Sequence, residues 1–352
     1  MLKATYKKYA LHFKQPAGTS RGVYTERESW FISLFDADNP RQAGLGECAP
    51  LPGLSPELDT GFKDKLAEAC RNIERSCALT PGDLSAFPSS IRMGLETAWL
   101  DYVNHGTKLF YRNDFTEGMR GIRINGLVWM GSAEFMEEQI RNKLREGYAC
   151  IKLKIGAGDF SADLALIRKI RKEYRADDVE IRVDANGAFA PTDVMDKLHA
   201  LAALHVHSIE QPVKPGQADF LARLCADSPL PIALDEELIG IDSLHCKQKL
   251  LNDIHPQFLV LKPSLHGGFR GCKEWIELAC ASNIGWWVTS ALESNIGLNA
   301  IAQWTSTLPY ILHQGLGTGQ LFMNNFASPL YIEKAELKYD GCKSWDISSL
   351  TK

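Results

Sequence analysis

The chain has 352 residues, of which 45% are hydrophobic and 23% charged, a balance typical of a globular protein with one large domain and a smaller one. Its net charge of −4 and its lack of dense Lys/Arg blocks argue against nucleic-acid or membrane binding, so we expect a small-molecule partner. No apolar run approaches the roughly 20 residues that span a bilayer, and no signal peptide is evident, so we expect a cytoplasmic protein. Nine scattered cysteines without a CxxC pair agree with that compartment and argue against a cysteine zinc site. The sequence leaves the oligomeric state undetermined.

Residues 1–105 combine early strand-like alternation, as in ESWFISLFD, with later helical patterns, and this predicts a separate α+β domain. From about residue 120 a unit recurs in which a short apolar run is followed by a turn and a helical pattern. The eight runs are GIRING, CIKLKI, EIRVDA, VHSIEQP, PIALDE, PQFLVLKP, GWWVTS and PYILHQG. They predict an α/β fold, a TIM-like (β/α) barrel over residues 106–326. The tail, residues 327–352, is expected to pack back on the N-terminal domain.

Polar residues close most of these apolar runs, at the strand ends where β/α barrels build their active sites. In chain order they are Lys152, Lys154, Asp184, Glu210, Asp235 with Glu236, Lys262 and Ser290. Each alone has an ordinary explanation, such as an Asn-Gly turn, a helix cap or a rim charge. The two lysines of IKLKIG are harder to explain in this way, because they share one face of a strand that has no solvated face in a closed barrel. Together the residues predict a charged site at one rim.

Three carboxylates on consecutive strands predict a site for a hard divalent cation. Mg²⁺ fits better than zinc, because histidine and cysteine are absent from the set, and Mn²⁺ is a possible substitute. Flanking lysines suggest abstraction of a proton α to a carboxylate, since the pKa of a buried lysine falls when another cation is near. We expect Lys154 to carry the proton because it lies nearer the C-terminal rim than Lys152, which would tune and orient it.

The KxK pair, the Asp, Glu, Asp series and the lysine of the sixth strand resemble the enolase superfamily, in its muconate-lactonizing subgroup, over nearly the whole chain. The stretches TSRGVYTERESWFI, VLKPSLHGGF, TSALESNIGLNAIAQW and GLGTGQLF resemble the o-succinylbenzoate synthase family of menaquinone synthesis. The resemblance implies an enolase-like N-terminal capping domain. Its loops, near residues 18–22 and 47–53, would close over a small-molecule carboxylate substrate.

The resemblance also implies an activity, the dehydration of 2-succinyl-6-hydroxy-2,4-cyclohexadiene-1-carboxylate to 2-succinylbenzoate. Lys154 would take the proton and then help the hydroxyl leave, and Lys262 would stabilise the anion from the opposite face. Mg²⁺ would be held by Asp184, Glu210 and Asp235. The residues supporting these ligands would be Asn186, Gln211 and Glu236, and the substrate contacts Ser290, Gly317, Thr318, Gly319 and Arg21.

Several other functions remain open on the sequence. The same site would serve an N-acylamino acid racemase, a dipeptide epimerase or a muconate cycloisomerase. An epimerase is disfavoured because the segment GLGTGQ has no acidic pair to hold a substrate ammonium. A Schiff-base aldolase using Lys154 or Lys262 would need no metal and would be trapped by borohydride. A non-catalytic binding barrel would not need the complete set of acids and bases.

Overall fold

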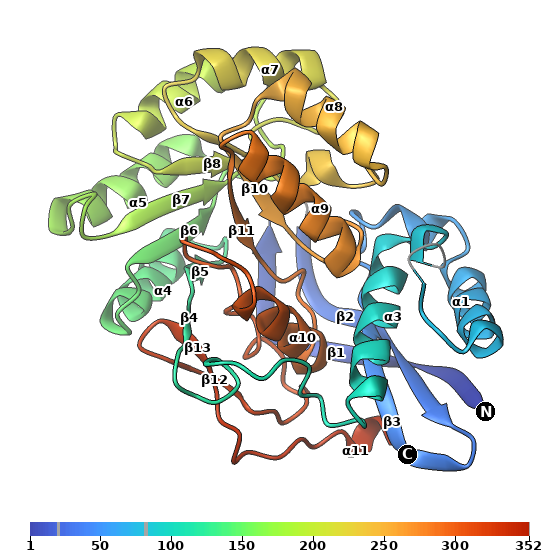
Figure 1. The fold of residues 1–352 in the computed structure, drawn as a ribbon. Coiled ribbons are helices and arrows are strands. Elements are labelled where there is room, and N and C mark those ends of the chain that lie inside the picture. The colour runs from blue at the N-terminus through green and yellow to red at the C-terminus, as the bar shows by residue number, and fades with distance from the viewer. Residues whose placement is uncertain (20–21, 81–83, 352) are drawn as a thin grey trace.

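The structure, a computed structural model, describes residues 1–19, 22–80 and 84–351. The chain begins with an antiparallel sheet in the order β1-β2-β3, built from Leu2–Thr19, Gly22–Asp36 and Asn39–Cys48 (Figure 1). The middle strand is buried on both faces, because alternate residues point to opposite sides of a sheet. Trp30 and Ile32 face one apolar cluster, and Phe31 faces another.

Helices cover the Trp30 face of this sheet. They are η1 (Pro56–Asp59), α1 (Phe62–Ser76) and α3 (Ser89–Val103). α3 crosses β3 with the two backbones in contact, because a Cβ at Gly46 would lie 1.9 Å from the carbonyl oxygen of Gly94. Only glycine allows this approach.

The second sheet is parallel and has seven strands in the order β11-β10-β9-β8-β7-β6-β5. Their bounds are Gly126–Val128 (β5), Cys150–Lys154 (β6), Glu180–Asp184 (β7), Ser208–Glu210 (β8), Ile232–Leu234 (β9), Phe258–Leu261 (β10) and Gly285–Val288 (β11). The helices that alternate with them are Ala133–Arg145 (α4), Phe160–Glu173 (α5), Val194–Ala202 (α6), Ala218–Asp227 (α7), Leu244–Ile254 (α8), Gly268–Ala281 (α9) and Asn295–Ser306 (α10), with a short η2 at Glu236–Leu238. The helices surround the curled sheet (Figure 1), and their apolar faces form the main core with the strands.

The two ends of the predicted barrel differ from expectation. Residues 121–126 were expected as the first strand, but the strand beside β6 is β5, and the preceding β4 (Ile122–Arg123) pairs elsewhere. Residues 309–315 were expected as the eighth strand, but they form only two parallel bridges, from Gln314 to Ile124 and from Gly315 to Thr289. The side-chain amide oxygen of Gln314 accepts a hydrogen bond from the backbone N–H of Val288 at 2.7 Å. This side chain takes the place of a backbone carbonyl in the hydrogen bonding between β11 and the segment at residues 309–315. These bridges close the barrel.

The C-terminal segment lies against both parts of the molecule. β12 (Leu330–Glu333) and β13 (Glu336–Tyr339) form a small sheet with β4, and α11 (Ser348–Thr351) ends near β3 (Figure 1). Phe326 packs on Phe31 with ring centroids 5.3 Å apart, and the ammonium of Lys7 donates to backbone carbonyls in α11. The boundaries at residues 105 and 326 stay a prediction.

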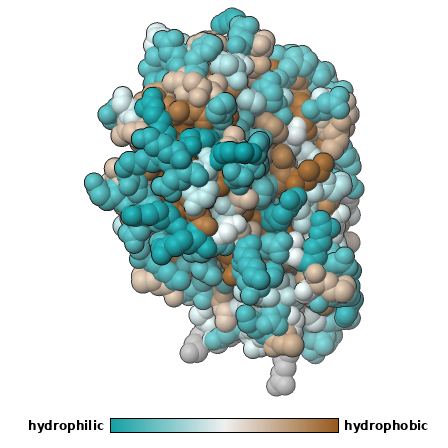
Figure 2. Space-filling model, turned by 90° about the vertical axis from the view of Figure 1, so that its left-hand side faces the viewer, coloured by the Kyte–Doolittle hydropathy of each residue, from teal (hydrophilic) through white to brown (hydrophobic). Residues whose placement is uncertain are grey.

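The outer surface is mixed in polarity. Figure 2 shows the side that carries α4 and α5 as mostly hydrophilic, with apolar residues scattered across it. Both helices bury an apolar stripe instead, for example Met136 and Ile140 of α4. Over the part of the chain that the structure describes, every helix is too short or too polar to cross a membrane.

Candidate active site

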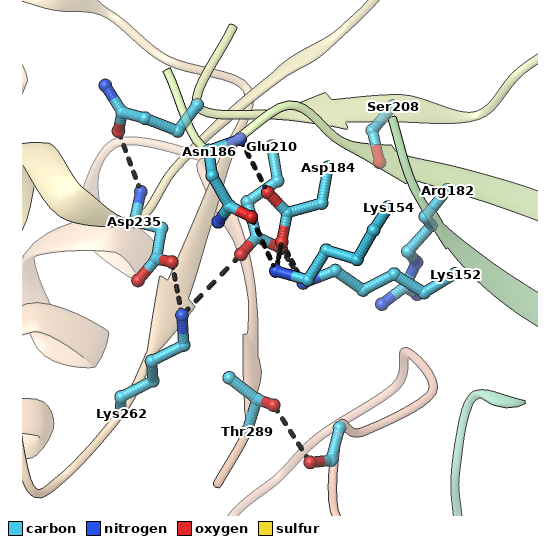
Figure 3. A network of polar contacts seen from close by, with 12 residues as sticks. Lys152, Lys154, Arg182, Asp184, Asn186, Ser208, Glu210, Asp235, Lys262 and Thr289 are labelled. Atoms are coloured by element: carbon cyan, nitrogen blue, oxygen red, sulfur yellow. Dashed lines mark hydrogen bonds and ion pairs between the residues drawn. The ribbon is translucent and has the colours of Figure 1, made fainter. Parts of the chain in front are cut away.

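The strand ends bring the predicted acids and lysines together inside the barrel. Lys154 is the register partner of Asp184, and Asp184 is the partner of Glu210, so three adjacent strands place their last polar residues side by side. All three residues are at least nine-tenths buried. Figure 3 shows the lysines of β6 and Lys262 reaching the carboxylates from opposite sides. The two-residue period of β6 explains why Lys152 also points inward.

The two lysines of β6 share one carboxylate. The Nζ atom of Lys154 lies 2.6 Å from Oδ2 of Asp184, and Nζ of Lys152 lies 2.9 Å from the same oxygen. Lys154 also donates to Oδ1 of Asn186 at 2.9 Å, whereas Lys152 donates to Glu210. Lys154 therefore binds Asp184 and Asn186, and Lys152, two residues deeper in β6, binds Asp184 and Glu210.

Lys262 reaches the same acids from β10. Its ammonium donates to Oδ2 of Asp235 and lies 3.7 Å from Oε1 of Glu210. The other oxygen of Asp235, Oδ1, and the Oε1 atom of Glu210 are buried and accept no hydrogen bond in the described part of the chain. Unsatisfied carboxylate oxygens in a buried site favour a further cation.

The pKa values of the three lysines shift in different directions. Burial lowers the pKa of Lys154, and the positive charges of Lys152 and Lys262 lower it further against the opposing effect of Asp184. The pKa values of Lys152 and Lys262 are raised, because the neighbouring carboxylates outweigh the cost of burial. Burial and the charge of Asp184 raise the pKa of Glu210 to about 8. Of these lysines, Lys154 is the one whose neutral form is favoured.

The three residues expected to support the ligands adjoin the acids. The backbone N–H of Asn186 donates to Oδ1 of Asp184 at 2.9 Å, and its side chain donates to Glu236 at 3.0 Å. Oε1 of Gln211 accepts from the backbone N–H of Asp235 at 3.3 Å. Asn186 and Gln211 have φ of 45° and 39°, so the chain turns sharply after β7 and β8 through the left-handed region, which asparagine adopts more readily than glutamine.

A cavity that is partly open to solvent lies over this cluster. Its walls include the three lysines, the predicted contacts Ser290, Gly317 and Thr318, and Tyr24, Leu51 and Leu54 from the N-terminal part. The hydroxyls of Ser290 and Thr318 lie 2.5 Å apart. Gly319 is not on this wall; a Cβ there would lie 2.7 Å from the side chain of Asn295. Arg21 lies outside the described residues.

Two further polar residues of this site are not predicted by the sequence pattern. Asn125 is 4% exposed and lines the cavity. His266 is fully buried beside Asp235, and burial lowers its pKa to about 4. Its position four residues after Lys262, in SLHGG, is the signal that could have found it, since a tight turn brings such residues together.

A second group of metal-binding residue types lies elsewhere in the barrel. Among the described residues, Cys150, Glu180 and His313 have ligand atoms within 4.8 Å of one another. Nε of Arg182 lies 2.5 Å from Oε1 of Glu180, so a cation there would displace an ion pair that already neutralises this acid. The all-carboxylate set at the strand ends is the better candidate for a hard cation.

Comparisons with known proteins point in one direction. A family model described as "Enolase C-terminal domain-like" matches residues 135–338. The chain is 45% identical to an o-succinylbenzoate synthase of Desulfotalea psychrophila, covering 94% of this chain and 97% of that protein. The crystal structure of MenC from Desulfotalea psychrophila LSv54 superposes with a TM-score of 0.81 at 40% identity, covering 96% of this chain and 99% of that one. A muconate lactonizing enzyme from Pseudomonas fluorescens, at 23% identity and a TM-score of 0.78 over 100% of this chain and 97% of that one, shares the fold.

Proposed function

This chain belongs to the enolase superfamily, in its o-succinylbenzoate synthase family, and from that premise we propose how its residues catalyse the family's reaction. The expected resemblance and fold class are confirmed. The reaction is a dehydration of 2-succinyl-6-hydroxy-2,4-cyclohexadiene-1-carboxylate, which yields 2-succinylbenzoate as a step of menaquinone synthesis. The single observation that carries the residue roles is the arrangement of Lys154 and Lys262 on opposite sides of three buried carboxylates, beneath one cavity.

Lys154 is the base. It lies at the rim end of β6, lines the cavity, and is the lysine whose pKa is lowered by burial and by neighbouring ammonium groups. Its neutral amine accepts the proton from the carbon that bears the substrate carboxylate. The protonated amine then donates to the hydroxyl on the adjacent carbon, which leaves as water, and the ring becomes aromatic.

Lys262 and Lys152 remain protonated throughout. Lys262 lies across the carboxylates from Lys154 (Figure 3), so its cation would face the substrate from the other side and stabilise the flat anion that forms when the proton leaves. Lys152 is held between Asp184 and Glu210, and its charge favours the neutral form of Lys154. The cavity is covered by Tyr24, Leu51 and Leu54, which limit the access of water to these charges.

The residues present fit a divalent cation. Asp184, Glu210 and Asp235 would hold it, because they supply oxygen ligands from three rigid strands and two of their oxygens are buried without a hydrogen-bond partner in the described structure. When bound, Mg²⁺ or Mn²⁺ supplies positive charge that stabilises the dianion developing on the substrate carboxylate. With Lys154 neutral, the ammoniums of Lys152 and Lys262 and a divalent cation together outweigh the three carboxylates, so the loaded site favours an anionic substrate such as this dicarboxylate.

Formation of the aromatic product tests the proposal. The purified protein should convert the cyclohexadiene carboxylate to 2-succinylbenzoate in the presence of Mg²⁺, followed by ultraviolet absorbance. Epimerisation of a dipeptide without dehydration of the cyclohexadiene would instead identify an epimerase. The uncharged cavity wall at Gly317 and Thr318 argues against that result, because it offers no acid for a substrate ammonium.

A further inference from the structure

The turn after β10 folds His266 back onto Lys262. The backbone N–H of His266 donates to the carbonyl of Lys262 at 2.9 Å, and the backbone N–H of Lys262 donates to Nδ1 of His266 at 2.9 Å. Gly268 follows with φ of 74°, and a Cβ at this position would lie 2.2 Å from Oε2 of Glu96. The turn therefore requires glycine, and it holds the imidazole in one orientation.

These contacts assign the tautomer of His266. Nδ1 accepts a hydrogen bond, so the proton of the neutral ring is on Nε2. The ring is fully buried, and its Nε2 has no hydrogen-bond partner in the described part of the chain. The acceptors that it faces belong to Asp235. Oδ1 of Asp235 lies 3.9 Å away, and the backbone carbonyl of Asp235 already accepts from Leu238 at 3.0 Å.

Oδ1 of Asp235 is itself buried without a hydrogen-bond partner among the described residues. A buried donor and a buried acceptor, each unsatisfied, thus face one another. A shift of about 1 Å would bring them to hydrogen-bond distance. The opposite oxygen of this carboxylate, Oδ2, is held by Lys262.

We propose that His266 is a positioning residue whose Nε2–H orients the carboxylate of Asp235 for metal binding. The inference rests on the proposed function in that Asp235 is taken as a metal ligand. One imidazole then aligns two parts of the site, because it is bound to the backbone of Lys262 through Nδ1 and faces Asp235 through Nε2. Residues that orient metal ligands in this way typically contribute 10- to 100-fold in metal affinity.

Two amide substitutions separate the two ring nitrogens. His266→Asn places an amide near the position of Nδ1 and can still accept from Lys262, but it has no donor that reaches Asp235. His266→Gln extends an NH₂ group toward the position of Nε2 and keeps that donor. Binding of Mn²⁺ alone to substrate-free protein, followed by the electron paramagnetic resonance signal of free Mn²⁺, should be about 10- to 100-fold weaker in His266→Asn and within about threefold of wild type in His266→Gln.

His207→Gln is the matched control, because His207 is a partly buried barrel histidine that lies beside Glu180. Its Mn²⁺ affinity should equal that of wild type. Wild-type affinity in His266→Asn would overturn the proposal, and so would equal losses in the Asn and Gln variants, since the donor would then not matter. If the wild-type protein binds Mn²⁺ but does not catalyse the dehydration, the proposed function is wrong and this inference about metal binding still stands.

A measurement on the unaltered protein guards against misfolded variants. Nitrogen-15 spectra of wild type labelled at histidine should show one histidine with a protonated Nε2, an unprotonated Nδ1 and slow exchange with solvent. That signal should vanish in His266→Gln. A proton on Nδ1 of this residue would overturn the assignment.

Discussion

The ammonium of Lys154 lies 2.6 Å from Oδ2 of Asp184, across a register pair that joins β6 to β7. The same oxygen accepts a second ammonium, that of Lys152, at 2.9 Å. Asp184 is therefore the residue through which the proposed base and the proposed metal site are coupled. A metal cation bound to this oxygen weakens the ion pair between Asp184 and Lys154, and it therefore favours the neutral form of Lys154.

Replacing Lys154 with alanine should abolish proton transfer, because no other lysine of the site has a lowered pKa. A substrate analogue whose hydroxyl is missing should exchange its α-proton with solvent deuterium in wild type and not in Lys154→Ala. Lys152→Ala should slow the exchange without abolishing it, because that residue acts through Lys154. Exchange at the wild-type rate in Lys154→Ala would mean that another group is the base.

Lys262→Ala should lose most of the turnover, by about 100-fold or more, because the anion loses a cation on one face. Mn²⁺ affinity should change far less, since the three carboxylates are untouched. Steady-state kinetics and Mn²⁺ titration on the same preparation check both statements. Turnover near that of wild type would make Lys262 an ordinary rim charge.

Removal of divalent cations should abolish turnover, and Mg²⁺ or Mn²⁺ should restore it. Asp184→Ala and Glu210→Ala should each weaken metal binding, because each removes a strand-end carboxylate. Full activity after exhaustive chelation would contradict the metal assignment. Glu180→Ala tests the second group, beside Cys150 and His313, and should leave the Mn²⁺ affinity unchanged.

Glu47 joins the N-terminal sheet to the barrel. It is 1% exposed and accepts from the hydroxyl of Ser29 at 2.7 Å and from the backbone N–H groups of Ser294 and Gly297 at 3.0 Å, at the start of α10. Glu47→Ala leaves these buried donors unsatisfied and should lower the free energy of unfolding by about 3 kcal/mol or more. Urea denaturation measures the loss, and Glu28→Ala, at a half-exposed carboxylate of β2, should cost less than about 1 kcal/mol.

Glu96 should make stability depend on pH. Burial raises its pKa to about 7 from an ordinary value of 4.5, although it accepts from the backbone N–H groups of Phe269 and Arg270. The folded state therefore binds more protons than the unfolded state between these values, and the contribution of Glu96 to stability falls by about 1.4 kcal/mol per pH unit as pH rises through them.

The variant Glu96→Gln should remove the contribution of this carboxyl to the dependence of the unfolding free energy on pH. The difference in unfolding free energy between pH 5.5 and pH 8 should be about 2 kcal/mol smaller in the variant than in wild type, by urea denaturation at both pH values. The exposed Glu68→Gln serves as the control and should show the slope of wild type. An unchanged slope in Glu96→Gln would show that Glu96 is ionised at both pH values.

The sequence by itself determined the features that depend on local periodicity. Alternating apolar runs and helical patterns were enough to predict the barrel, because a strand has a period of two and a helix of 3.6 wherever they occur. The same period placed Lys152 and Lys154 on one inward face, and the carboxyl ends of parallel strands placed Asp184 and Glu210 beside them. The catalytic and metal-binding roles of these residues stay a prediction.

Only the tertiary structure decided what depends on contacts between distant segments. Residues 309–315 have an apolar run like the other strands, yet the side chain of Gln314 takes the N–H of Val288 that a longer ladder would use. The role of Glu47 depends on Ser294, which lies far along the chain. His266 looks like a loop residue until the turn at Lys262 aims its Nε2 at Asp235. Such contacts leave no periodic pattern in the sequence. They depend on which buried polar groups come within hydrogen-bond distance when the chain packs.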